Sequence, residues 1–352
     1  MLPEGGGHIA TAAAPERGLG TVRDQLRRLS SVSPVDHRLA LVVQGGAMRG
    51  IYSMAALSVL EEEGLRDAFT YVVGSSAGAI NGAYFVAGQA REALSIYTDE
   101  LAGGEFVSPL RFWKILDVDH LVDEVLKDRH PLDVEAMRAA RPSLFTVLTD
   151  ADTAEAAVVS SQESKLDLFE VLRATAACPG LYNRRVTLGS RRYIDGGIAS
   201  LVPLEIAYGL GATGALVLLT RDLDHRRRVR GRAYEEALRV LPAGRSKSVR
   251  SRLSAADPDH DQTIAALKCE TQQAPRKTWT LCPSSKTRLV GRTTDDRERL
   301  WDCVELARAD MRRLLDQPSG GAFPPPRPGE PGSRQPRPAV NLRRADARSP
   351  HW

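Results

Sequence analysis

The apolar positions of the chain form two strand–turn–helix units near its beginning. The first unit has a continuous apolar run over 38–43, a turn, and a helix over 51–63 in which apolar residues recur every three positions. The second has an apolar run at 71–73 and a helix-compatible segment at 79–86. Continuous apolar runs are typical of strands buried on both faces of a parallel sheet. The repeat predicts a three-layer α/β/α fold around a mainly parallel central sheet.

The same reasoning extends the sheet and its helical layers along the chain. Further strands are expected at 144–148, 156–159, 191–194, 215–220 and 278–282, and further helices at 165–177, 203–210 and 295–315. The segment 109–131 is rich in aromatic and acidic residues. We expect it to form a helical or looping cover over one end of the sheet.

Composition divides the chain into four parts. Residues 1–37 are expected to be a flexible N-terminal arm, with room for a short helix at 21–29. Residues 38–222 form the expected core domain, and 223–316 an extension packed on it. In 317–352 Pro, Gly, Ser and Arg dominate and apolar periodicity is lost, so this tail is expected to be disordered.

The charge of the chain bears on its partners. A net charge of +4 over 352 residues is too small to imply a nucleic-acid partner. The basic excess is concentrated in 226–252 and in the last part of the chain. Near an anionic bilayer each Lys or Arg contributes about 1 kcal/mol of attraction. Contact with an anionic membrane surface and simple solubilisation both explain these residues, and the sequence leaves that choice and the oligomeric state open.

The cysteines and the apolar runs of the sequence bear on the cellular compartment of the protein. The four cysteines (Cys178, Cys269, Cys282 and Cys303) are far apart and form no Cys-x-x-Cys pair, which argues against a disulfide framework or a zinc site. No apolar run approaches the ~20 residues of a membrane span, and the N-terminal segment lacks the pattern of a signal peptide. We therefore expect a cytoplasmic protein without a transmembrane segment, at most peripheral to the inner face of the membrane.

Ser76 stands where a nucleophile is expected in such a fold. Gly74-Ser75-Ser76-Ala77-Gly78 directly follows an apolar run and precedes a helix, which is the layout of a Gly-x-Ser-x-Gly nucleophile elbow. Gly74 and Gly78 lack the Cβ atoms that would collide as strand and helix close around a strained turn. The helix N-terminus also directs N–H groups toward an oxyanion formed when Ser76 attacks a carbonyl.

The turn Gly45-Gly46-Ala47 is the candidate for further oxyanion donors. Its small residues allow backbone N–H groups to approach an oxygen closely, and a helix begins near Met48. A phosphate-binding loop is the alternative. However, residues 44–50 have neither Gly-x-Gly-x-x-Gly spacing nor a Gly-Lys-Ser/Thr ending.

Asp195 is the first candidate for the base. It ends an expected strand, and Gly196 and Gly197 allow the backbone to turn tightly beside a cleft, although Asp-Gly-Gly is also an ordinary turn.

Histidines are the rival bases. His225 follows Ser76 and Asp195 in the chain order of α/β-hydrolase triads, but it lies in a run of charged residues. His120 and His130 lie in the expected cover. Residue types alone leave the choice open.

Taken in order, the three motifs resemble the signatures of the patatin-like phospholipase family. They are the glycine-rich loop 44–50 with its basic residue, the elbow 74–78, and the Asp-Gly-Gly motif 195–197. Each motif is common alone, but their order and the short distance between the first two are specific. The resemblance covers roughly 38–221, and 278–315 is more weakly similar to the C-terminal extension of bacterial members.

This resemblance implies a patatin-like fold and a serine lipid acyl hydrolase, a carboxylic ester hydrolase acting on phospholipids or other acyl lipids without metal or cofactor. Ser76 would attack the ester carbonyl while Asp195 accepts its proton. The implied oxyanion and substrate-binding residues are Gly45, Gly46, Ala47, Arg49 and Gly50, and the supporting motif glycines are Gly74, Gly78, Gly196 and Gly197.

Two conditions accompany this interpretation. An ordinary aspartate, with a pKa of about 3.9, is a weak base at neutral pH, so burial must raise the pKa of Asp195. The family usually has glycine where Ala47 stands, so the methyl group is tolerated only if φ at Ala47 is below zero. Two alternatives stay open: an esterase with a Ser76/Asp195/His225 triad, and a non-catalytic lipid- or nucleotide-sensing module on the same scaffold.

Overall fold

A mainly parallel β-sheet lies at the centre of the fold. The computed structural model describes residues 20–32, 37–111, 113–224, 239, 246–254, 258–268 and 277–320. In these segments one eight-stranded sheet has the order β5-β6-β3-β2-β1-β7-β8, with β4 also paired to β3. The strands are β1 (Leu39–Val43), β2 (Tyr71–Ser75), β3 (Ser143–Asp150), β4 (Ala156–Ser160), β5 (Val186–Leu188), β6 (Arg191–Asp195), β7 (Gly214–Leu218) and β8 (Lys277–Leu281).

The direction of the strands agrees with the expected fold class. β1, β2, β3, β7 and β8 pair in parallel, whereas β4 and β6 run antiparallel to β3, and β5 antiparallel to β6. The apolar run of β1 is continuous because both faces of this strand are buried. Leu39 and Leu41 belong to one hydrophobic cluster, whereas Ala40 and Val42 belong to a second cluster on the other face. The three-layer prediction is therefore confirmed.

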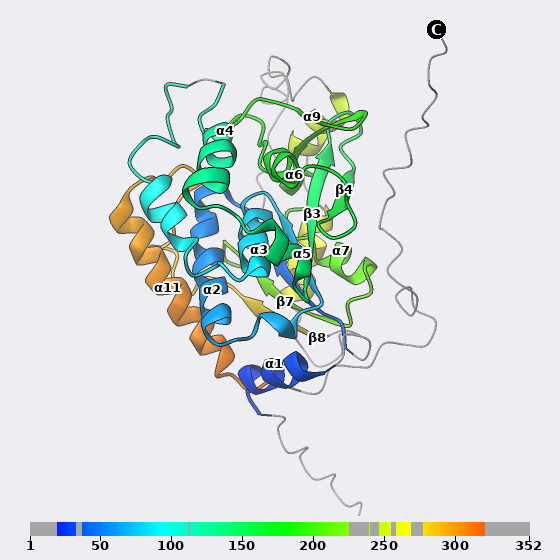
Figure 1. The fold of residues 1–352 in the computed structure, drawn as a ribbon, viewed down its shortest axis with the longest axis vertical. Helices are drawn as coiled ribbons and strands as arrows, with labels where there is room; N and C mark the ends of the chain where they lie inside the picture. The colour runs from blue at the N-terminus through cyan, green and yellow to red at the C-terminus, as the bar shows by residue number, and fades with distance from the viewer. Residues whose placement is uncertain are drawn as a thin grey trace, which may run out of the picture.

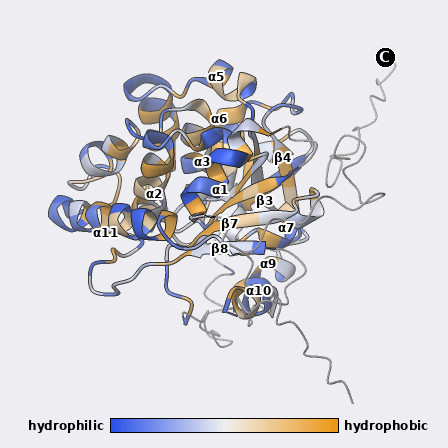
Figure 2. Ribbon diagram, turned by 90° about the horizontal axis from the view of Figure 1, so that it is seen from below, coloured by the Kyte–Doolittle hydropathy of each residue, from blue (hydrophilic) through white to orange (hydrophobic). Residues whose placement is uncertain are grey.

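Helices cover both faces of the sheet (Figure 1, Figure 2). One side carries α1 (Val22–Ser31), α2 (Gly50–Glu62), α3 (Ala77–Ala87), α5 (Val134–Ala139), α6 (Leu168–Thr175) and α11 (Arg297–Leu315); the other carries α7 (Leu204–Gly209), α9 (Lys247–Ser254) and α10 (Pro258–Lys268). Every residue of α3 is buried, as expected for a helix enclosed by other elements. Within the described segments, no helix combines the length and apolar character needed to cross a membrane.

The C-terminal elements join the same sheet and layer as the early ones. β8 pairs with β7, and α11 lies alongside α2 (Figure 1). Between these helices, the Tyr52 hydroxyl donates to the buried Asp310 carboxylate at 2.9 Å, which also accepts the Ser284 N–H at 3.0 Å. These contacts fix the position of the loop that precedes α11.

The N-terminal arm and the C-terminal tail differ in part from the sequence prediction. α1 begins with a capping box between Thr21 and Asp24, and it buries Val22 and Leu26. The Val22 N–H donates to the Gln317 carbonyl at 2.9 Å. The short helix for which the sequence left room at 21–29 is present as α1, which packs on the fold instead of lying loose, and 317–320 is placed against α1. An amphipathic face, rather than composition, decides the structure of this segment.

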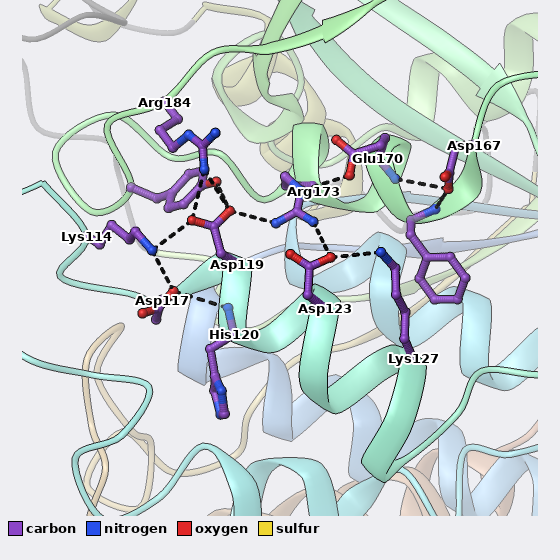
Figure 3. A network of polar contacts seen from close by, with 12 residues as sticks. Lys114, Asp117, Asp119, His120, Asp123, Lys127, Asp167, Glu170, Arg173 and Arg184 are labelled. Carbon is purple, nitrogen blue, oxygen red and sulfur yellow. Dashed lines mark hydrogen bonds and ion pairs between the residues drawn. The ribbon is translucent and has the colours of Figure 1, made fainter.

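The expected cover consists of short helical segments over one end of the sheet. After η3 (Ile96–Glu100), a loop leads to α4 (Val118–His120) and η4 (Leu121–Arg129). Charged side chains join this cover to α6 and to the segment between α6 and β5 (Figure 3). The Asp119 carboxylate accepts from Arg173 at 2.7 Å, from Lys114 at 2.8 Å and from Arg184 at 3.0 Å. Arg173, which is buried, also donates to Asp123 at 2.7 Å.

These contacts stabilise the ionised form of Asp119. Burial alone would raise the pKa of this carboxyl, but hydrogen bonds from Lys114 and Tyr182 and the charge of Arg184 outweigh it and lower the pKa from 3.8 to about 2. A carboxylate with a lowered pKa in the folded state stabilises the fold above its unfolded pKa, and this contribution is lost as the pH falls.

We expect Asp119→Asn to lower the free energy of unfolding at neutral pH by roughly 2 kcal/mol, because three cations lose their common partner. The difference from wild type should narrow as the pH falls from about 5 toward 2. Urea unfolding across this range measures it. Asp128→Asn, at an exposed position of η4, is the matched control. A difference that is independent of pH would contradict the assignment.

Candidate active site

Ser76 and Asp195 meet because two strands end at the same place on β3. Ser75 at the end of β2 pairs with Val147, and Asp195 at the end of β6 pairs with the next residue, Leu148. β4 pairs with Leu148 from the opposite edge of β3. β2 and β6 therefore lie along one edge of β3, run in opposite directions, and bring their carboxyl ends together.

Ser76 occupies a strained turn between β2 and α3. Its φ and ψ are 55° and −135°, a conformation that non-glycine residues rarely adopt. The flanking glycines are required by space: a Cβ at Gly74 would lie 2.6 Å from the Gly78 carbonyl oxygen, and one at Gly78 would overlap the Val43 carbonyl. The geometry expected of a nucleophile elbow is present.

The side chains of Ser76 and Asp195 are in direct contact. The Ser76 hydroxyl donates to Asp195 Oδ2 at 2.9 Å, and the two residues are only 9% and 4% exposed. The other carboxylate oxygen accepts the Gly197 N–H at 2.7 Å. A Cβ at Gly196 would overlap the Val147 carbonyl, so the Asp-Gly-Gly turn fits this position only with glycine at 196.

Burial raises the pKa of Asp195. The Gly197 N–H, the charge of Arg292, and hydrogen bonds from Ser76 and the Cys178 thiol act in the opposite direction and favour the carboxylate. The direction agrees with the condition that the sequence placed on a carboxylate base.

Thr175 is a site residue that the sequence did not reveal. The Ser76 N–H donates to the Thr175 hydroxyl at 2.8 Å, and this hydroxyl donates to the Val147 carbonyl at 2.6 Å. The side chain ties the elbow to β3. Because the Ser76 amide is occupied in this way, oxyanion donors must come from other residues.

The glycine-rich loop lies directly beside the elbow. A Cβ at Gly45 would be 2.8 Å from the Ser76 Cβ. Gln44 and Thr220 fix the loop, since Gln44 Oε1 accepts the Thr220 N–H at 2.7 Å and the Thr220 hydroxyl donates to the Gly45 carbonyl at 3.0 Å. Ala47 follows Gly46 and begins the short helix η1 (Ala47–Arg49).

Ala47 fails the condition set by the sequence. Its φ is +53°, in the left-handed region, so the methyl group is held in a strained backbone conformation. Ala47 also lines the pocket next to Ser76. The loop keeps the backbone shape that glycine would adopt without strain. Alanine at this position therefore lowers the free energy of unfolding.

Arg49 and Gly50 have roles that differ from those expected. Burial and the charges of Arg221 and Arg292 lower the pKa of Arg49 to about 9. A Cβ at Gly46 would lie 3.1 Å from Arg49 Nε, so this side chain folds over the loop and does not line the pocket. Gly50 provides packing space, because a Cβ there would overlap the Tyr97 hydroxyl.

Asn81 on α3 joins the elements beneath the site. Its Nδ2 donates to the Gly50 carbonyl at 2.8 Å and to the Ser53 hydroxyl at 2.9 Å. Its Oδ1 accepts the Tyr97 hydroxyl at 2.9 Å. Burial raises the pKa of Tyr97, so the phenol stays protonated and serves as a donor.

An apolar pocket of about 580 Å³, part of it open to solvent, leads away from Ser76. Its polar lining consists of a few side chains, which include Ser76, Asp195 and Arg292. The lining residues are Ala47, Met48, Met54, Ser76, Ala77, Ile80, Asn81, Ile96, Tyr97, Leu101, Phe106, Leu116, Val118, Leu121, Ala176, Cys178, Asp195 and Arg292. An unbranched apolar chain can lie in this space while a polar group at its end reaches Ser76.

The histidine candidates lie elsewhere. His120 Nδ1 is 3.0 Å from Glu124, and His130 Nε2 is 3.3 Å from Glu100; neither histidine lines the pocket. His225 lies outside the described residues. Among the residues that the structure does describe, no group of three or more His, Cys, Asp or Glu side chains is arranged to hold a metal ion.

We expect Ala47→Gly to increase the free energy of unfolding by about 0.5–1 kcal/mol, because glycine adopts a positive φ without strain. Urea unfolding measures the change. Ala154→Gly is the matched control, since Ala154 also has a positive φ (65°) but lies in the turn between β3 and β4. Stabilisation by Ala154→Gly but not by Ala47→Gly would contradict the assignment of strain to the loop.

Comparison with known proteins finds several that are similar to parts of this chain. An uncharacterised protein of Escherichia coli strain K12, YjjU, is 32% identical over 196 residues, which cover 52% of this chain and 52% of the relative. The chain thus matches about half the length of this curated relative. Among solved structures, VipD from Legionella pneumophila (14% identity, TM-score 0.45, 81% of this chain and 67% of that one) and human GIVD cytosolic phospholipase A2 (12%, 0.47, 84% and 62%) are similar.

The sequence model described as patatin-like phospholipase matches residues 41–208. This range begins in β1 and ends in α7, and it contains the glycine-rich loop, the elbow and the Asp-Gly-Gly turn. The segment 41–208, just under half of the chain, is therefore similar to patatin-like phospholipases.

Proposed function

We propose that the protein is a serine lipid acyl hydrolase in which Ser76 and Asp195 form a catalytic dyad. The observation that carries the proposal is the 2.9 Å hydrogen bond from the Ser76 hydroxyl to Asp195, at the end of an apolar pocket. A nucleophile within hydrogen-bond reach of its base is the arrangement required for acyl transfer.

The reaction proceeds through an acyl-enzyme. Ser76 Oγ attacks the ester carbonyl while its proton passes to Asp195, and the N–H groups of the 45–47 loop stabilise the resulting oxyanion. Collapse of this intermediate breaks the ester bond, and the departing alcohol takes the proton from Asp195. Water then attacks the acyl-enzyme, gives a proton to Asp195, and releases the fatty acid as the proton returns to Ser76.

The pocket favours esters with long acyl chains. Nearly all of its lining away from the dyad is aliphatic or aromatic, and each methylene group transferred into such a site contributes about 0.8 kcal/mol. The substrate is therefore a phospholipid or another acyl lipid. Contact with an anionic membrane surface and a cytoplasmic location remain predictions, since most of the basic run at 226–252 lies outside the described residues.

Direct contact between Ser76 and Asp195 supports the dyad over the two alternatives. In a triad an imidazole would stand between serine and aspartate. Here the carboxylate itself accepts the hydrogen bond from the serine hydroxyl. A non-catalytic module has no need of a strained, buried serine beside a base. His225→Ala should then leave turnover unchanged.

We expect Ser76→Ala to abolish labelling by a fluorophosphonate probe, and both Ser76→Ala and Asp195→Asn to reduce hydrolysis of p-nitrophenyl butyrate and phospholipid vesicles by at least about a thousandfold. The base is lost in Asp195→Asn although the side chain keeps its shape. Ser75→Ala, at a neighbouring buried serine whose hydroxyl makes no hydrogen bond, is the control for folding. Wild-type protein that neither labels nor hydrolyses would contradict the proposal.

We expect Leu121→Trp to shorten the acyl chain that the enzyme accepts. Leu121 lines the pocket from the cover, and a larger ring there displaces several methylene groups of a bound chain. Hydrolysis of p-nitrophenyl palmitate should fall about ten- to a hundredfold relative to the butyrate ester. Leu110→Trp is the control, because Leu110 is 84% exposed. An equal loss for both esters would indicate general damage instead.

A further inference from the structure

Arg292 reaches the site from a segment outside the part of the chain that matches the family. It lies in the loop before α11 and lines the pocket together with Ser76 and Asp195. Its Nη2 donates to Cys178 Sγ at 2.9 Å. Its backbone carbonyl accepts the Met48 N–H, in η1, at 3.3 Å. One residue thus contacts both the glycine-rich loop and the side of the site that holds the base.

The loop around Arg292 is well anchored. Val290 is buried in the main hydrophobic cluster, and the Gly291 N–H donates to the Thr294 hydroxyl at 2.8 Å. The Asp295 carbonyl accepts the Gly103 N–H at 3.1 Å. The side chain of Arg292 is solvent-exposed at the pocket mouth, but its origin is fixed by the fold.

Cys178 links Arg292 to the base. Its sulfur accepts from Arg292 Nη2 at 2.9 Å, and its thiol is among the groups that lower the pKa of the Asp195 carboxyl. The backbone of Cys178 is held by the N–H groups of Leu181 and Tyr182, at 3.0 and 2.8 Å. The preceding residue, Ala177, accepts the Asp195 N–H at 3.0 Å. The thiol is therefore placed by the same backbone that places the base.

These contacts affect the ionisation of Asp195. Burial disfavours the charged carboxylate, yet the base must be ionised to accept a proton at neutral pH. Cys178 and Arg292 are the titratable groups that act on Asp195, together with the Ser76 hydroxyl and the Gly197 N–H. Beyond Arg292, Arg49 and Arg221 add further positive charge on the side of the loop.

We propose that Arg292 and Cys178 are positioning residues for the dyad, which hold the Asp195 carboxylate in its ionised form and in line with Ser76. The inference rests on the proposed function. It assigns to the catalytic unit a residue from beyond residue 208, so the family-matched domain is incomplete without the loop before α11.

The test is the pH dependence of kcat/KM for p-nitrophenyl butyrate. Arg292→Gln should move the acid limb of the kcat/KM profile to higher pH by about half to one unit. This shift is small for the loss of a neighbouring charge, because Arg292 is exposed and its charge is partly screened. Activity should approach that of wild type above the shifted limb. Arg292→Lys, which keeps the charge, should restore much of the wild-type profile. Arg299→Gln, in the exposed first turn of α11, should leave the profile unchanged.

Variants of the thiol test the link between the two residues. Cys178→Ser keeps a donor to Asp195 and should shift the acid limb less than Cys178→Ala. Because Arg292 acts partly through Cys178, the shift in Cys178→Ala/Arg292→Gln should be smaller than the sum of the two single shifts.

The two proposals fail in different ways. If wild-type Ser76 labels with fluorophosphonate and the Arg292→Gln profile coincides with that of wild type, the inference about Arg292 is overturned while the dyad stands. A uniform loss of activity at every pH would likewise overturn it, since that result indicates a structural role only. Wild-type protein without Ser76-dependent labelling or hydrolysis would overturn both.

Discussion

The hydrogen bond between Ser76 and Asp195 depends on one constraint of the backbone: two strands must end at adjacent positions on the same edge of β3. Several hydrogen bonds and a glycine hold the two strand ends in this position. Thr175 ties the elbow to Val147, and the Thr149 hydroxyl donates to the Asp195 carbonyl at 2.7 Å. Gly196 is required because the turn passes directly over the Val147 carbonyl. The chemistry of the site is thus determined by how closely the backbone can approach β3.

Burial of Ser76 and Asp195 has two opposing effects. It strengthens the hydrogen bond between them and excludes water, but it also raises the pKa of Asp195, the proposed base. The structure balances these effects with a backbone donor, a thiol and an exposed guanidinium, and none of these adds a second buried charge. The ionic contacts around Asp119 lie on the same side of the molecule and hold the cover whose apolar residues form the pocket wall.

Local sequence patterns predicted the central strands and the motif residues, because buried parallel strands are continuous apolar runs and elbows need glycine at fixed positions. The expected strand 144–148 lies within β3, and the helix 295–315 nearly coincides with α11. Thr175, Asn81 and Arg292 were not predicted, since each acts through a contact with a distant segment that leaves no local pattern. The positive φ of Ala47 was equally hidden, because it is set by the loop's contacts with Thr220 and Ser76.

The C-terminal elements show that the site extends beyond the segment that carries the motifs. β8 completes the sheet beside β7, and α11 covers α2, the helix that follows the glycine-rich loop. Asp310 on α11 accepts from both Tyr52 on α2 and Ser284 in the loop that leads to Arg292. The packing of α11 therefore bears on the position of the loop that carries Arg292. Under the role proposed for Arg292, this packing lets a residue distant in sequence act on the charge of Asp195 without a direct bond to it.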